Sequence, residues 1–330
     1  MKTIRKVRTL TILVLLGFAL TMLFYGEGQA KTQLQMPLGG VRGSYYMIGA
    51  PTAKYVNEHS DKIMVTPNTS GGGVENIRRV SQGVAHLGMA TAMEMHKAWN
   101  GMAPFKKPMK KWMTIGVSTK VLLNHCATLA KYKIRNVEDT KGRIFAIGAP
   151  GSAAAAMMLE FLEFTGLAKD ITMRKLPHKD YPTMLMDGKI EVFNRLGAVP
   201  SGSVEQIATQ TKLALIEFDG LLKKTDFIEK HPYYQKITVP GGTYKGEARD
   251  TTFFGAAGYF IVRADLPDDI VYEFTRLAYS EASIKSVTMA FKGNGLTRAT
   301  PLKGNIGPVH PGAAKFWKEI GLTIPEPGLK

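Results

Sequence analysis

The sequence contains a single cysteine, Cys126, so an intramolecular disulfide is excluded. Cys126 ends the apolar run 121–126, where we expect a buried structural thiol and not a catalytic one. A chain of 330 residues can bury a large hydrophobic core without disulfides, and this length favours two domains over one.

Long hydrophobic runs are equally scarce, since only residues 10–24 form one. Four basic residues precede this run, and the small-x-Ala site Gly28–Ala30 follows it. The run has roughly 15 apolar residues and falls short of the ~20 that a membrane-spanning helix needs, although a membrane anchor is the alternative interpretation. We therefore predict that residues 1–30 are a cleavable signal peptide and that the mature protein is soluble and periplasmic.

The usual catalytic and metal-binding motifs are missing. There is no HExxH zinc motif, no CxxC pair and no GxSxG nucleophile elbow, and the seven histidines are scattered. No loop has the P-loop or the complete GxGxxG spacing. We predict no metal, no cofactor and no catalysis, with His96 and His310 in structural roles. Two carboxylates brought together by folding leave no local pattern, so a hydrolytic pair stays open as an alternative.

Acidic residues are in deficit, because 27 Asp and Glu face 43 Lys and Arg, for a net charge of +16. A basic balance suits nucleic acid, a membrane surface or anionic small ligands. The predicted export, the even spread of the lysines and the lack of a nucleic-acid motif disfavour nucleic acid. An anionic ligand and an ordinary solvated basic surface both remain compatible with the charge.

Short apolar runs alternate with helical patterns, which is typical of an α/β fold with largely parallel strands. The helical pattern is clearest where Val74, Ile77 and Val80 share one face. We expect strands at 33–38, 63–67, 85–90, 143–147, 190–194 and 257–262, and helices that begin near Tyr45, Val74, Ser152, Tyr181 and Asp269.

Three glycine-rich loops, at 39–44, 70–73 and 148–152, each stand between an expected strand and an expected helix. Glycine lets the backbone turn tightly and approach a ligand, and the amides at a helix N-terminus attract a carboxylate or phosphate. The serines at 44, 70 and 152 either donate to such a ligand or cap the helix. One such loop indicates only a turn and a cap. Three loops that share this strand–loop–helix arrangement predict an anion-binding cleft beyond the strand ends.

The loops belong to a series of motifs that resembles the TAXI family, the solute receptors of TRAP transporters. Any one motif is a weak match, whereas seven in the same order are specific. The motifs are GSYYMIG (43–49), SGGGVEN (70–76), QGVAHLG (82–88), GAPGS (148–152), DGKIE with GAVP (187–191 and 197–200), VPGGTYKG (239–246) and HPGA (310–313).

This resemblance implies a periplasmic binding protein fold of the type II kind, with two α/β lobes joined by crossover strands and a ligand cleft between them. The implied crossings lie near Thr119 and Phe254. Lobe 1 then comprises residues 31–118 and 256–330, and lobe 2 comprises residues 119–255.

The resemblance also implies a function. The receptor would capture a small organic anion, such as a dicarboxylate, a keto acid or an acidic amino acid like glutamate or 2-oxoglutarate. It would deliver this anion, as a monomer, to a TRAP permease for ion-gradient-driven uptake. The alternative is a periplasmic sensor that presents its ligand to a membrane signalling receptor.

Four positions depart from the family motifs. His86 and Glu191 each replace an aspartate at an element edge, and we expect both to be structural. Arg42 replaces a glycine and Ala153 replaces the second glycine of a GSG sequence, each in a loop that faces the expected cleft. These two departures put the best-known ligands of the family in doubt for this chain.

The predicted ligand contacts come from the three loops and the ends of two strands. Arg195 follows a predicted strand and can hold a carboxylate bidentately, although a solvent-exposed or lobe-bridging arginine is the alternative. Tyr45 is expected either in the core or against the ligand, and Asn76 either at the ligand or fixing its loop. The full predicted set is Arg42, Ser44, Tyr45, Ser70, Gly72, Gly73, Asn76, Thr91, Ser152, Ala153, Asn194 and Arg195.

Overall fold

The computed structural model describes residues 30–41, 43–150 and 152–329. The predicted signal peptide lies almost wholly outside this part of the chain. Residues 33–330 form one compact unit, distinct from residues 1–32, and the account below concerns the larger unit. No helix in the described ranges is both long and apolar enough to cross a bilayer.

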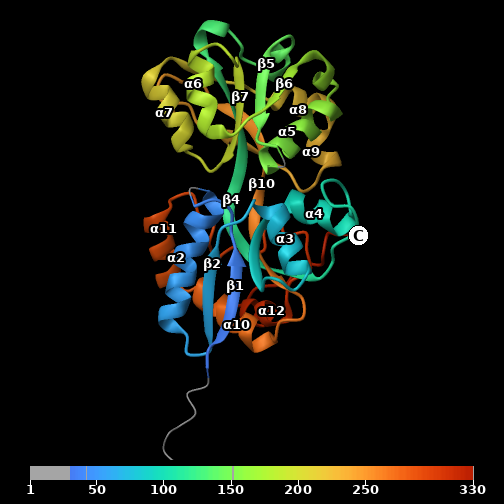
Figure 1. Cartoon of the computed structure of the whole chain (residues 1–330), viewed down its shortest axis with the longest axis vertical. Coiled ribbons are helices and arrows are strands. Elements are labelled where there is room, and N and C mark those ends of the chain that lie inside the picture. Colours follow the sequence, from blue (N-terminus) through green and yellow to red (C-terminus); the bar gives the residue numbers. More distant parts are fainter. Residues whose placement is uncertain (1–29, 42, 151, 330) are drawn as a thin grey trace, which may run out of the picture. The chain divides into compact units, whose positions relative to one another are not determined.

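An eight-stranded mixed sheet runs through this unit (Figure 1). Six strands follow the order β3-β10-β4-β7-β5-β6, while β8 pairs with β4 and β9 with β10. Only β5 pairs in parallel, with β6 and β7; the other pairings are antiparallel. The strands are β3 (Leu87–Thr91), β4 (Trp112–Leu129), β5 (Ile144–Gly148), β6 (Thr172–Lys175), β7 (Val192–Gly197), β8 (Leu213–Leu215), β9 (Gln235–Val239) and β10 (Thr251–Arg263).

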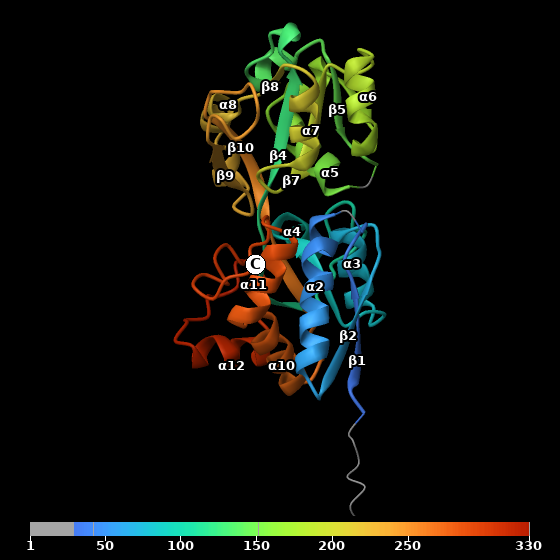
Figure 2. The same ribbon diagram turned by 90° about the vertical axis from the view of Figure 1, so that its left-hand side faces the viewer.

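The expectation of largely parallel strands is therefore wrong for this sheet. The mostly antiparallel pairing follows from the two long strands β4 and β10, which run antiparallel side by side through the middle of the unit (Figures 1 and 2). Every strand that pairs with either of them is antiparallel to it. The α/β class itself is confirmed.

The two long strands change register near their middle, where Gly258 lies opposite Thr119 and shifts occur on both sides of Gly258. The Gly258 amide donates to Thr119 Oγ1 at 2.8 Å. A β-carbon at Gly258 would lie only 2.6 Å from that oxygen, so a larger residue would displace the Thr119 side chain and break this bond. Such irregularities bend a strand pair and increase its local twist.

A separate two-stranded sheet, β1 (Thr32–Pro37) with β2 (Ile63–Asn68), lies beside helix α2 (Ser44–His59). Apolar residues of these elements pack with those of three helices near the end of the chain. These helices are α10 (Asp268–Ala278), α11 (Glu281–Ala290) and α12 (Pro311–Glu319). Trp317 and Tyr279 stack edge to face at the centre of this cluster.

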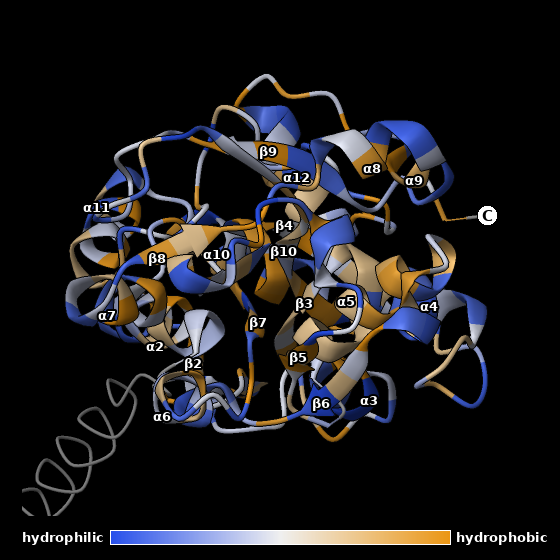
Figure 3. Cartoon of the chain, turned by 90° about the horizontal axis from the view of Figure 1, so that it is seen from above, coloured by the Kyte–Doolittle hydropathy of each residue, from blue (hydrophilic) through white to orange (hydrophobic). Residues whose placement is uncertain are grey.

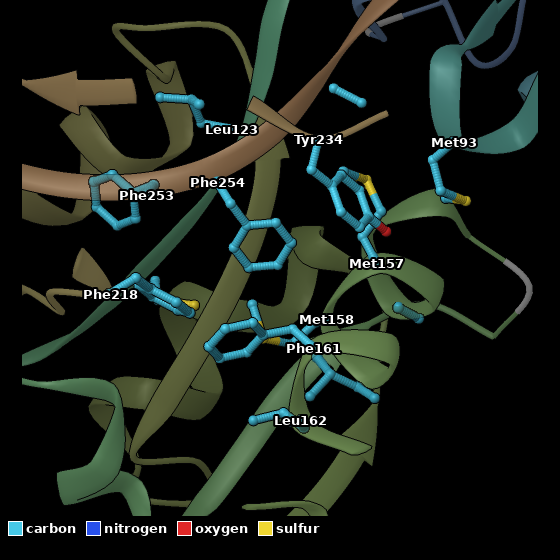
Figure 4. Packing of buried hydrophobic residues seen from close by; sticks show 14 of the residues in the cluster. Met93, Leu123, Met157, Met158, Phe161, Leu162, Phe218, Tyr234, Phe253 and Phe254 are labelled. Carbon is cyan, nitrogen blue, oxygen red and sulfur yellow. The ribbon is translucent and has the colours of Figure 1, made fainter. Parts of the chain in front are cut away.

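A second core cluster extends along both long strands. Helix α5 (Ala153–Phe164) contributes Phe161, whose ring stacks on Phe254 of β10 at 5.0 Å between centroids (Figure 4). Viewed from above, the central strands carry the hydrophobic colours, and hydrophilic segments lie on outer helices (Figure 3). The helices around this cluster are α3 (Gly73–Ser81), α4 (Ala92–Asn100), α6 (Tyr181–Met186), α7 (Gly202–Gln210), α8 (Asp219–Thr225) and α9 (Phe227–Lys230).

The element boundaries follow the hydrophobic pattern closely. All six expected strands are present as β1, β2, β3, β5, β7 and β10, and the five expected helix starts correspond to α2, α3, α5, α6 and α10. The hydrophobic pattern did not predict the long strand β4, because polar residues such as Thr119, Lys120 and Asn124 interrupt its apolar run; only the family resemblance implied a crossover strand near Thr119.

Candidate functional site

A cavity of about 260 Å³ lies where the three glycine-rich loops meet the end of β7. One wall comes from the starts of α2, α3 and α4, and the other from α5, α6 and β7, on the far side of the strand crossing (Figures 1 and 2). Its lining residues are Leu38, Gly39, Gly40, Gly43, Ser44, Tyr45, Ser70, Gly71, Gly72, Gly73, Val74, Glu94, Leu122, Gly148, Ala149, Ser152, Ala153, Ala154, His178, Tyr181, Asn194, Arg195 and Leu196.

The N-termini of the three helices at the cavity differ in what caps them. Helix α2 has Gly43 at its N-cap, and no side-chain cap bond is formed there. Helix α5 is capped by Ser152, whose hydroxyl accepts from the Ala155 amide at 3.2 Å and donates to the Ala149 carbonyl at 2.8 Å. Helix α3 begins after Gly72 and lies against the carboxylate of Glu94. The open amides of α2 are therefore best placed to bind an external anion.

Arg195 is the one arginine or lysine among the described residues that line the cavity. It lies on β7 opposite His125 of β4, whose Nδ1 donates to the Arg195 carbonyl at 3.2 Å. Its Nη1 donates to the Leu196 carbonyl, while its buried Nε has no hydrogen-bond partner among the described residues. Burial lowers the pKa of Arg195, and in the described ranges no carboxylate pairs with it.

Tyr181 presents a second unsatisfied group to the same cavity. Its side chain is 2% exposed, and its buried hydroxyl has no partner among the described residues. Burial raises the pKa of Tyr181, and the nearby Arg195 charge opposes that rise. Burial and Arg195 also lower the pKa of His178, which borders the cavity on the same side. A buried polar atom without a partner is uncommon, and Arg195 and Tyr181 each carry one at this cavity.

Asn194 lines the cavity but has its amide engaged within the protein. Its Nδ2 donates to Asn124 Oδ1, to the Ile147 carbonyl and to the Ala154 carbonyl, each at 3.1 Å. These bonds tie β7 to β4, β5 and α5, and so they fix the strand end from which Arg195 extends.

Glu94 is a carboxylate in the opposite wall, and sequence reasoning missed it. Its Oε2 accepts from the Thr91 amide at 2.8 Å and the Thr91 hydroxyl at 2.9 Å, and more weakly from the Tyr45 hydroxyl at 3.4 Å. Burial raises the pKa of Glu94, while bonds from Thr91, Tyr45 and the Val74 backbone oppose that rise. The spacing Thr91-x-x-Glu94 after a strand, typical of a capping box, is the signal that could have revealed it.

Nine of the twelve predicted contacts line this cavity, and their role as ligand contacts stays a prediction. Asn76 and Thr91 do not line it. Asn76 fixes its loop instead, since it accepts from Ser70 Oγ at 2.6 Å and donates to the Met89 carbonyl at 2.8 Å. Thr91 caps α4. Arg42 lies outside the described residues. The nine are Ser44, Tyr45, Ser70, Gly72, Gly73, Ser152, Ala153, Asn194 and Arg195.

Three of the histidines and Glu191 have structural surroundings. His310 caps α12, and His86 Nδ1 accepts from the Gln35 amide at 3.1 Å. The His96 ring lies 4.7 Å from that of Tyr233. Glu191 pairs with Arg143 at 2.9 Å. Across the part of the chain that is described, no group of three His, Cys, Asp or Glu residues is arranged to hold a metal ion.

Comparison with solved structures places the fold among known ones. A structure from Streptococcus mutans, concerned with glutathione import through GshT and the cystine ABC importer TcyBC, is 13% identical with a TM-score of 0.51. The match covers 81% of this chain and 98% of that one. A periplasmic transporter is 15% identical with a TM-score of 0.50, covering 88% and 93%. The periplasmic aliphatic sulphonate binding protein SsuA from Escherichia coli is 14% identical with a TM-score of 0.49, covering 88% and 91%.

The chain thus has the α/β fold of the periplasmic binding proteins, with a mixed sheet flanked by helices. The model of the NMT1-like family matches residues 37–321, and the chain belongs to that family.

Proposed function

We propose that this protein is an extracytoplasmic solute receptor that captures a small organic anion and delivers it to a membrane transporter without catalysing a reaction. The observation that carries the proposal is Arg195, a largely buried cation whose Nε has no partner among the described residues. Arg195 lines the cavity together with Tyr181, whose buried hydroxyl also has no partner among the described residues.

Electrostatics explains why this arrangement favours an anion. A charge removed from water is costly unless it is paired and hydrogen-bonded. A ligand carboxylate would supply the missing counter-charge and accept from both Arg195 Nε and the Tyr181 hydroxyl. The open first turn of α2, next to Ser44, would add backbone amides from the opposite wall. The cavity volume of about 260 Å³ suits a small metabolite.

We further propose a two-lobed division of the mature chain, with lobe 1 at 31–118 and 256–330 and lobe 2 at 119–255. The register shifts around Gly258 and Thr119 support a hinge at this crossing. Because the two cavity walls belong to different lobes in this division, a ligand that touches both walls would favour the closed state.

The motif series supports a TRAP permease as the partner and a periplasmic location after removal of residues 1–30. The fold of periplasmic binding proteins agrees with that location. Under this proposal the ligand class comprises dicarboxylates, keto acids and acidic amino acids. A periplasmic sensor that presents the ligand to a signalling receptor would use the same cavity.

A thermal-shift screen tests the proposal. Mature protein would be unfolded, dialysed and refolded to remove bound ligand, then screened against mono- and dicarboxylates, keto acids, amino acids and aromatic acids. Ligands that bind only the native state raise Tm by mass action. We expect a clear shift with one class of acid, loss of that shift in Arg195→Ala, and retention in Arg174→Ala. Arg174 is an exposed arginine on β6 and serves as the matched control. No shift with any acid would refute the proposal.

A further inference from the structure

The same cavity contains a buried carboxylate and a largely buried guanidinium that do not pair with each other. Glu94 on α4 and Arg195 on β7 both line it, and neither forms an ion pair within the described ranges. They extend from the two opposite walls, because α3 and α4 lie on one side of the strand crossing and β7 and α6 on the other (Figure 1). The cavity is therefore dipolar.

The carboxylate of Glu94 occupies the place that the glycine loop 70–73 was expected to offer to a ligand anion. A β-carbon at Gly73 would collide with both carboxylate oxygens and the carboxylate carbon of Glu94. The Val74 backbone bonds to this side chain, so the first turn of α3 already has its anion. A second carboxylate next to Glu94 would meet repulsion in a site of low effective dielectric.

We propose that Glu94 is a specificity-determining residue that selects ligands with one anionic group and, at the other end, a cationic or hydroxyl group. The anionic group is bound by Arg195 and Tyr181, and the donor group of the ligand faces the Glu94 carboxylate. Dicarboxylates without such a donor are rejected. This inference rests on the proposed function and narrows its ligand class.

Two variants separate the effect of the Glu94 charge on ligand selectivity from the effect of the α4 cap on stability. Glutamine at position 94 removes the charge yet can still accept from the Thr91 amide, as glutamine does in a capping box. Thr91→Ala removes the cap of α4 and leaves the Glu94 charge in place. Only the first variant should change ligand preference, whereas both should lower Tm.

The test is calorimetry with acids that share their methylene chain and differ at one end. The first set is glutarate, 4-aminobutyrate and 4-hydroxybutyrate, and the second is succinate, 3-aminopropanoate and 3-hydroxypropanoate. If both sets fail to bind, the tightest acid from the thermal-shift screen is compared with its own analogues that exchange a terminal carboxylate for an amine or a hydroxyl. We expect the better donor-ended acid to bind at least about tenfold more tightly than its diacid in the wild-type protein and in Thr91→Ala. In Glu94→Gln this ratio should fall at least about tenfold.

Tighter binding of the diacid by the wild-type protein, or an unchanged ratio in Glu94→Gln, would overturn the selectivity of Glu94 and leave the receptor function standing. Failure of every acid in the screen to bind would overturn the receptor function and, with it, this inference.

Discussion

Two buried cations of this protein contrast in how their charges are balanced. Lys97 of α4 lies 3.1 Å from Glu160 Oε1 of α5, and the two side chains are 10% and 16% exposed. The hydroxyls of Tyr233 and Tyr234 donate to Glu160 at 3.2 and 2.6 Å. Arg195 has no carboxylate partner among the described residues, and its Nε is unpaired.

The contrast separates a charge that the chain pairs by itself from a charge that, in the proposed function, a ligand pairs. Glu160 receives its counter-ion and its hydrogen bonds from the chain itself, so the Lys97 pair is complete in the ligand-free protein. Arg195 and Tyr181 line the cavity, and we propose that an anion from outside completes them. The first arrangement should govern stability, and the second should govern binding.

The largest expected effect concerns the complete pair. Glu160→Ala leaves Lys97 buried without a counter-ion and should lower the free energy of unfolding by about 3–5 kcal/mol. Urea denaturation of the ligand-free protein measures this change. Glu163→Ala, an exposed glutamate on the same helix, is the control and should change it by less than about 0.5 kcal/mol. A similarly small effect for Glu160→Ala would mean that the Lys97–Glu160 pair does not govern stability, and would contradict the contrast with Arg195.

The next effect concerns the geometry of the incomplete site. Arg195→Lys keeps the charge but loses the planar fork that can hold a carboxylate with two bonds, so the Kd should rise about 30- to 100-fold. Isothermal titration with the best acid from the screen measures the change. An unchanged Kd would mean that Arg195 acts only as a distant charge.

A pH effect of similar size comes from His125, which supports Arg195 from the neighbouring strand. Burial lowers the pKa of His125 from 6.5 to about 4. The unfolded state therefore takes up a proton first as pH falls through 6.5, and stability is lost progressively between pH 6.5 and 4. From this group we expect a loss of about 2 kcal/mol between pH 7 and pH 5.

His125→Gln is the variant that isolates this contribution, because four other histidines also have lowered pKa values. They are His86, His96, His178 and His310. Unfolding curves at each pH should show a flatter dependence in the variant. Equal slopes in the two proteins would contradict a buried neutral His125.

The smallest effect concerns the unpaired hydroxyl of Tyr181. Tyr181→Phe removes a buried group with no partner among the described residues, so the ligand-free protein should keep or gain stability. Ligand affinity should fall about tenfold, since one hydrogen bond to a charged group is lost. Tyr234→Phe should show the reverse pattern, with lower stability and unchanged affinity.

The sequence predicted the outline of the fold well, because local hydrophobic patterns determine where β1, β2 and α3 begin. It failed for the direction of the strands, since the pairing of β4 with β10 joins residues more than 100 positions apart. In the site, the glycine loops and Arg195 were visible as strand-end motifs. Glu94 and Tyr181 were not, because their significance depends on burial and on partners that no local pattern specifies.

The central claim is that Arg195 is a binding charge and not a structural one. The most direct test is the unfolding free energy of ligand-free Arg195→Met compared with that of the wild-type protein. Since the variant removes a largely buried charge without a counter-ion and keeps most of the apolar volume, we predict equal or greater stability together with lost binding. A loss of more than about 2 kcal/mol in the ligand-free variant would show that the chain itself uses the charge, and would contradict the account.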